Sequence, residues 1–135
     1  PISYKMVNAR IWTFPGIGQI LALTILYEIG DINRFPSVQQ FASYSRLVKC
    51  KAESAGKTYG TSGNKIGNGY LKWAFSEAAV LYLRGNDNAK RYLAKLQKRM
   101  SKGKALSALA HKIGRCVYFM LRDRQVFDEN KFLKG

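Results

Sequence analysis

The stretch from about Lys104 to Arg122 carries the clearest periodic pattern in the sequence. At about 100° per residue, the increment of an α-helix, its apolar side chains fall on one arc. These are Leu106, Leu109, Ile113, Cys116, Val117 and Met120, and the basic stripe opposite them is Lys104, His111, Arg115 and Arg122. We therefore expect a long helix with one face in the core. The basic face is either a surface that lies along phosphates or an ordinary solvated face.

Helical spacing recurs along most of the chain, and no strand-like alternation is long enough to predict a sheet. The expected helices cover about 4–13, 20–29, 37–47 and 71–82, with a further helix around 92–96 after a break at 85–88. A short tail from 126 to 135 should dock through Phe127 and Phe132. At 135 residues the chain can build one core. We predict an all-α, compact helical domain that spans 1–135.

Residues 10–30 form a helix-hairpin-helix-like element in this interpretation. The turn Phe14-Pro15-Gly16-Ile17-Gly18 stands directly before an apolar helix. Glycine allows close approach to its backbone, and the free N–H groups of a helix start bind phosphate. We therefore expect Gly16 and Gly18 to contact a nucleic-acid backbone. The alternative is a plain turn between two helices, closed by Pro15 and Gly16.

The net charge favours a polyanionic partner. The chain has 23 Lys and Arg against 8 Asp and Glu, a formal charge of +15. Such an excess repels itself, and nucleic acid relieves the repulsion while releasing its own counterions. A basic surface kept for solubility is the alternative. No apolar run reaches the length that crosses a bilayer, so we expect no membrane partner.

Between residues 49 and 68 the apolar periodicity is lost, and glycines alternate with Lys, Ser, Thr and Asn. We expect a long mobile Gly/Lys/Ser loop, and loops of this length in a compact domain usually have a function. Ser54 lies in it. A serine hydroxyl can attack a DNA phosphate and hold the strand as a phosphoserine ester. It needs a base or metal for activation and cations for the developing charge. A solvated loop serine is the alternative.

A set of short pieces, in order and spacing, carries a resemblance to a known family. They are Phe14-Pro15-Gly16-Ile17-Gly18, Glu28-Ile29-Gly30-Asp31-Ile32, Arg34-Phe35, Phe41-Ala42-Ser43-Tyr44, Glu53-Ser54-Ala55-Gly56-Lys57, Lys65-Ile66-Gly67-Asn68, Leu71-Lys72, Ala78-Ala79, Gly103-Lys104-Ala105-Leu106 and Ala110-His111-Lys112-Ile113. From Trp12 to about Asp128 the chain resembles the C-terminal transposase domain of the insertion-sequence family one-ten. That family is grouped with families one-sixteen and nine-oh-two and with the Piv-type DNA invertases.

The resemblance implies one part of a two-part DNA transposase or site-specific recombinase. The other part is similar to Holliday-junction resolvases and binds magnesium through an Asp-Glu-Asp-Asp set, and we expect it to precede this chain in a longer protein. Ser54 matches the serine nucleophile of the family through its Ser-x-Gly-Lys context. Ala55 departs from the family pattern, in which glycine follows the serine directly. Ser62, which precedes Gly63, is the second candidate nucleophile.

Further expectations follow for sites and partners. The residues expected to contact DNA or RNA, besides the hairpin glycines, are Lys57, Tyr59, Lys65, Asn68, Lys72, Lys104, His111, Lys112 and Arg115. We expect no metal site or cofactor in this chain, so that alone it binds DNA without cutting it. Cys50 and Cys116 predict neither a disulfide nor a zinc site, which favours a reducing intracellular setting.

The resemblance adds a guide-like RNA as a candidate partner, assembly into a homo-oligomer when intact, and a place at the nucleoid in a prokaryotic cytoplasm. The competing hypothesis, from another class, is a helix-hairpin-helix module that binds nucleic acid without chemistry.

Overall fold

The computed structural model describes residues 11, 13–48, 53–54, 57–58 and 67–134. Its helices are α2 (Gln19–Ile29), the 3-10 helix η1 (Ile32–Arg34), α3 (Val38–Tyr44), α5 (Gly69–Leu83), α6 (Asp87–Gln97), α7 (Lys102–Asp123) and α8 (Glu129–Phe132). The predicted all-α class is confirmed. Of the helix expected over 4–13, all but residues 11 and 13 lie outside the described part of the chain.

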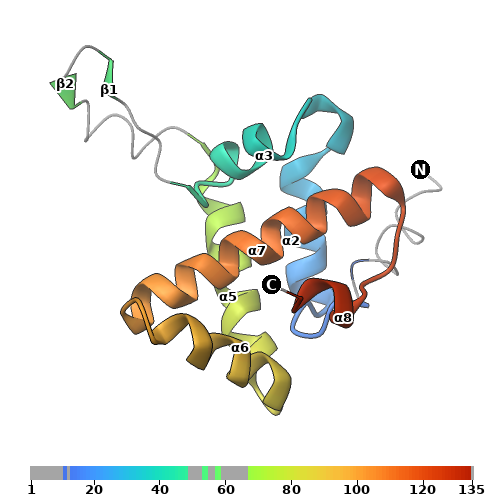
Figure 1. Cartoon of the computed structure of the whole chain (residues 1–135). Coiled ribbons are helices and arrows are strands. Elements are labelled where there is room, and N and C mark those ends of the chain that lie inside the picture. The colour runs from blue at the N-terminus through green and yellow to red at the C-terminus, as the bar shows by residue number, and fades with distance from the viewer. Residues whose placement is uncertain (1–10, 12, 49–52, 55–56, 59–66, 135) are drawn as a thin grey trace.

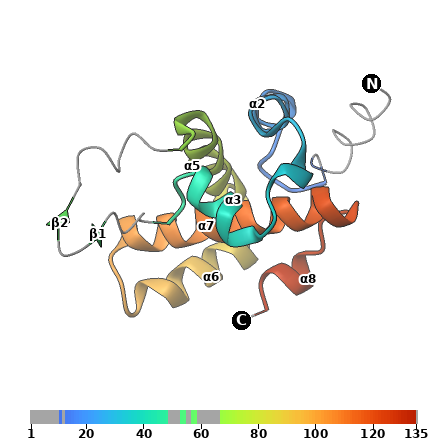
Figure 2. The same cartoon turned by 90° about the horizontal axis from the view of Figure 1, so that it is seen from above.

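Two strands of two residues each, β1 (Glu53–Ser54) and β2 (Lys57–Thr58), form an antiparallel ladder that the sequence did not predict. Two residues are too few to show an alternating pattern. Both views place this ladder apart from the helical body (Figures 1 and 2).

Helix α7 is the central element of the fold. It crosses α5, with α3 along one side and α6 along the other (Figure 1). Burial extends further around α7 than the periodicity predicted, because Ala110, Gly114 and Tyr118 are also buried. Leu106 and Cys116, by contrast, are only half-buried. Helix α7 also contacts η1, and with four neighbouring elements it keeps only a narrow exposed stripe.

The helix ends follow the local sequence. Side-chain oxygens of Ser37, Asn68, Asn86, Ser101 and Asp128 each accept a backbone N–H in the first turn of the helix that follows. Gly30, at φ 69°, ends α2 as predicted. Helix α3 ends at Tyr44 rather than near residue 47, because the chain turns through the left-handed region at Arg46 (φ 56°).

Phe14 joins the hairpin, α5 and the tail of the chain. Its ring centroid lies 4.3 Å from that of Phe127, 5.3 Å from that of Phe132 and 5.2 Å from that of Tyr82. Tyr82 donates its hydroxyl to Glu129 Oε1 at 3.1 Å, which ties α8 to α5. The predicted docking of the tail through its two phenylalanines is confirmed.

The two glycines of the hairpin have different surroundings. Gly16 has φ +99°, and a Cβ there would lie 2.8 Å from the backbone N of Tyr82 and 3.0 Å from the carbonyl O of Ala78. Gly18 has φ −84°, is exposed and would carry a Cβ with no heavy atom within 4 Å. Close packing on α5 therefore explains why residue 16 is a glycine. At Gly18 no packing contact requires a glycine, and the backbone is open to solvent.

This difference gives a matched pair of variants. Gly16→Ala should lower the free energy of unfolding by about 1–3 kcal/mol, because the new methyl group meets the α5 backbone in an unfavourable φ region. Gly18→Ala should change it by less than about 0.5 kcal/mol. Urea unfolding followed by circular dichroism measures both, and equal losses would show that the hairpin does not pack on α5 as described.

Candidate nucleic-acid interface

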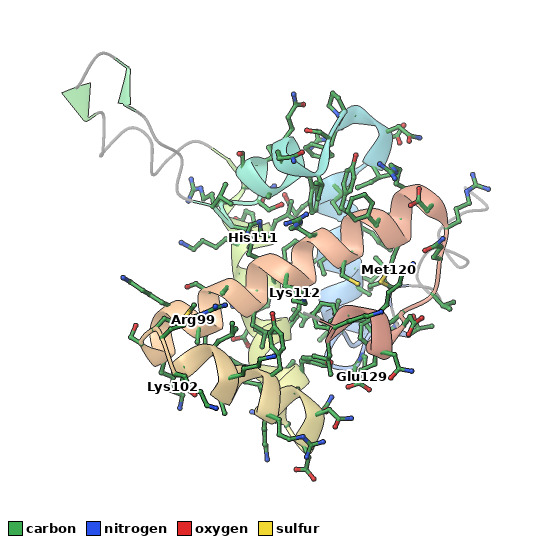
Figure 3. All side chains as sticks on the ribbon, viewed as in Figure 1. Arg99, Lys102, His111, Lys112, Met120 and Glu129 are labelled. Atoms are coloured by element: carbon green, nitrogen blue, oxygen red, sulfur yellow. The ribbon has the colours of Figure 1, made fainter. Side chains whose placement is uncertain are left out.

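The stretch from residue 88 to residue 122 contains no Asp or Glu. Its ten cations are Lys90, Arg91, Lys95, Lys98, Arg99, Lys102, Lys104, Lys112, Arg115 and Arg122. The stretch forms most of α6, the following turn and α7. Figure 3 shows Arg99 and Lys102 at the turn and Lys112 further along α7. Positive charge spread over two adjacent helices attracts a polyanion over distances longer than that of a single hydrogen bond or ion pair.

The predicted basic stripe of α7 is not uniform. Lys104, Arg115 and Arg122 are exposed, whereas His111 is half-buried. Burial, with a smaller effect of the nearby Arg115 charge, lowers the pKa of His111 below its ordinary value. The imidazole is therefore neutral near pH 7 and adds no charge to the stripe.

Two cations of α7 are engaged within the molecule. The Lys112 ammonium lies 5.3 Å from the ring centroid of Tyr92 and 5.4 Å from that of Phe132, between α6 and α8. Arg122 Nε lies 2.9 Å from Asp123 Oδ1, a pair exposed to solvent. Within the described residues, no acidic partner is recorded for Lys104 and Arg115, which are left to interact with a ligand.

Asn68 closes the base of the segment between α3 and α5. Its Oδ1 accepts the N–H of Leu71, and its Nδ2 donates to Glu28 Oε1 at 2.7 Å and to Tyr44 Oη at 3.3 Å. The hydrogen bond with Asn68 and the neighbouring Arg34 lower the pKa of Tyr44. Asn68 is thus a structural junction of three helices. Lys72, one turn into α5, is exposed.

This junction was not predicted from the sequence, although its members stand in three of the pieces that carry the family resemblance. Glu28, Tyr44 and Asn68 come from separate pieces and meet through hydrogen bonds. Gly67 belongs to the same place, because at φ +105° a Cβ would lie 2.6 Å from the carbonyl O of Tyr44. The family resemblance marks these residues in the sequence, but the sequence does not show that they are in contact.

For the candidate nucleophiles the structure gives only backbone information. Ser54 lies in β1, and its Cα is paired in the ladder with that of Lys57 in β2. The side chains of both, and the whole of Tyr59, Ser62 and Lys65, lie outside the described residues, as does Cys50. Among the side chains that are described, no group of three or more His, Cys, Asp or Glu could hold a metal ion.

A helical domain with one cationic pair of helices is a class to which many nucleic-acid-binding proteins belong. The particular family is given by comparison with known proteins. The model of the transposase IS116/IS110/IS902 family matches residues 8–94. The chain belongs to this family.

Related proteins have low sequence identity to this chain. It is 26% identical to a transposase for insertion sequence element IS1111A from Coxiella burnetii, over 87% of the chain and 34% of that protein. It is 25% identical to an uncharacterized 44.8 kDa protein of insertion element IS116 from Streptomyces clavuligerus, over 87% of the chain and 30% of that protein. The chain therefore spans about a third of the length of these relatives. No solved structure matches it.

Within the described residues, none of the helices has the length and apolar character needed to cross a membrane.

The state of His111 can be tested through the pH dependence of stability. Its pKa is lowered in the folded state, so below its ordinary value of 6.5 the unfolded chain binds more protons than the folded chain. The free energy of unfolding should therefore fall as the pH drops through 6.5 towards the lowered value, and level off below it. His111→Gln should remove this part of the pH dependence. Urea unfolding between about pH 7.5 and about pH 5 measures it, and identical profiles would contradict the assignment.

Proposed function

We propose that this chain is the serine-bearing part of a DNA transposase that cuts and rejoins DNA strands. The observation that carries the proposal is the family match over residues 8–94, supported by a relative that is itself named a transposase. The acid-free stretch of ten cations on α6 and α7 supports a nucleic-acid partner independently of the family.

In the proposed reaction, Ser54 Oγ attacks a DNA phosphorus. The P–O bond to one strand end breaks, that end leaves as a hydroxyl after taking up a proton, and the other end stays on Ser54 as a phosphoserine ester. Attack by a DNA hydroxyl on this ester rejoins the strands and releases the serine. The Cα pairing of Ser54 with Lys57 in the ladder supports the proposal, because a phosphate under attack needs a nearby cation. Ser62 is the second candidate.

Magnesium would supply the activation of the hydroxyl, held by the carboxylates of a nuclease-like domain elsewhere in a longer protein. The chain covers about a third of its relatives, which leaves length for such a domain. A guide-like RNA and assembly into a homo-oligomer belong to the same proposal.

The second candidate function is a module that binds nucleic acid and performs no chemistry. It is favoured by one observation, the open side of Gly18 at the start of α2, where free N–H groups suit a phosphate. Both functions predict binding, and they differ in whether a covalent adduct forms.

Binding should depend on salt through individual cations of α7. Replacing Arg115 by Gln should reduce the slope of log K against log salt by about 0.9 for duplex DNA, because one phosphate contact is lost. His111→Gln is the matched control on the same stripe and should leave the slope unchanged near pH 7.5, because the imidazole is already neutral. Fluorescence anisotropy with a labelled duplex at several salt concentrations measures both slopes. Equal slopes for wild type and Arg115→Gln would show that the α7 stripe is not part of the binding surface.

The nucleophile is tested in the longer protein that contains this chain. Incubation with transposon-end DNA and magnesium should give a protein–DNA adduct that survives denaturing electrophoresis. Ser54→Ala should abolish it, whereas the matched control Ser62→Ala should keep it. An undiminished adduct in Ser54→Ala rules out this serine, and an adduct lost only in Ser62→Ala makes the second candidate the nucleophile. The isolated chain should cut nothing.

A further inference from the structure

Helices α6 and α8 lie on the same side of α7 and border an open groove (Figure 2). Its volume is about 430 Å³, which falls in the range of pockets that hold small ligands. Among the residues that line it are Asn88, Arg91, Tyr92, Lys95, Glu129 and Lys134. None of them was expected to contact a ligand, so the groove is a site separate from the basic stripe of α7.

Hydrogen bonds and ring packing hold the two walls of the groove together. Glu129 Oε1, at the start of α8, accepts hydrogen bonds from the Tyr82 hydroxyl at 3.1 Å and from Asn86 Nδ2, in the cap of α6, at 3.3 Å. The ring of Phe132, at the end of α8, lies 5.3 Å from that of Phe14 in the core. The groove is therefore formed before a ligand arrives, which lowers the entropic cost of binding.

Three exposed cations line the groove. Arg91 and Lys95 lie one turn apart on α6, and Lys134 follows α8. Within the described part of the chain, no carboxylate is recorded at salt-bridge distance from any of the three. Arg91 donates a hydrogen bond to Asn88 Oδ1, which restrains the guanidinium at the groove. Cations gathered in this way repel one another, and a bound phosphate relieves the repulsion.

Tyr92 supplies an aromatic ring to the same groove. The ring is half-buried, and the Lys112 ammonium lies 5.3 Å from its centroid. Cations beside an aromatic ring are typical of sites for single strands, in which the cations bind the backbone and the ring stacks on an unpaired base. A paired base remains inside the stack of a duplex and does not reach into a concave site. The groove therefore suits an unpaired nucleotide better than a duplex.

The carboxylate of Glu129 disfavours an acidic peptide as the ligand. Glu129 lines the groove, and no hydrogen bond to its Oε2 is recorded among the described residues. A peptide carboxylate would be repelled by this charge at close range. A nucleobase, by contrast, carries N–H groups that a carboxylate oxygen accepts. One nucleotide offers both the phosphate that the cations favour and the N–H donor that Glu129 favours.

We propose that the groove between α6 and α8 binds one unpaired nucleotide of a nucleic-acid strand, with its base against Tyr92 and its phosphates on Arg91, Lys95 and Lys134. The inference deepens the proposed function and rests on it in one respect, that the partner is a nucleic acid. Arg91 and Lys95 belong to the acid-free stretch, so a strand can continue from the groove towards the turn after α6. A free mononucleotide would not gain these further contacts.

Fluorescence anisotropy with labelled single strands of about eight nucleotides tests the contribution of the base. Two probes carry the same number of phosphates, and one consists of thymidines while the other consists of abasic residues. The wild type should bind the thymidine strand at least about fivefold more tightly, because the abasic strand cannot stack. Tyr92→Leu keeps an apolar side chain and should reduce this ratio to less than about twofold. Circular dichroism checks that the variant folds.

A second variant, Lys95→Gln, leaves the ring in place and tests the phosphate contact. It should reduce the slope of log K against log salt for the thymidine strand by about 0.7, because one phosphate contact of a single strand is lost. Lys90→Gln is the matched control, because Lys90 is exposed on the same helix but does not line the groove. It should leave the slope unchanged.

Equal binding of the two strands by the wild type overturns the proposal, and so does a preference for bases that persists in Tyr92→Leu. Unlabelled poly-glutamate that displaces the thymidine strand as well as the unlabelled strand does would identify an acidic-peptide site instead. A chain that binds duplex DNA but does not distinguish the two single strands refutes the groove alone. A chain that distinguishes them, while the longer protein forms no covalent adduct, refutes the proposed function alone.

Discussion

The burial of α7 on three sides is the constraint on which the rest of the structure depends. Tyr118, almost fully buried in the second half of α7, donates its hydroxyl to the carbonyl O of Phe35 at 2.9 Å and so fixes the segment between α2 and α3. A Cβ at Gly114 would meet Leu47 Cδ1, so the Leu47 side chain, which follows α3, packs directly on the α7 backbone. Helices α5 and α6 pack against other sides of α7. The exposed residues of α7 therefore lie on a narrow stripe, and the packing fixes the direction in which that stripe faces.

This arrangement separates charge from apolar surface. The acid-free stretch forms most of α6 and α7, whereas α2 and α5 have a net charge of −1 and carry six of the seven large apolar side chains that are exposed in the described part of the chain. Positive charge and exposed apolar surface therefore lie on different helices. The ladder that holds Ser54 belongs to neither of these helix pairs.

Most helices could be predicted from the sequence, because their local signals agree with their tertiary environment. Helix α2 ends at Ile29, and Phe127 and Phe132 dock the tail, both as expected. The contacts of the candidate site residues were harder to predict from the sequence. Asn68, which was expected to contact nucleic acid, also joins three helices, and the Lys112 ammonium lies over two rings. These outcomes depend on contacts between residues 20 or more positions apart, which periodicity does not encode.

The sequence by itself determined the helical class, the excess of positive charge and the family to which the chain belongs. Each of these is a property of local pattern or of composition, so no folded structure is needed to read it. Only the tertiary structure decided that burial lowers the pKa of His111 and that Gly16 is required by packing on α5. The physical reason is that burial and pairing depend on which elements meet, and helices with similar periodicity can meet in many ways.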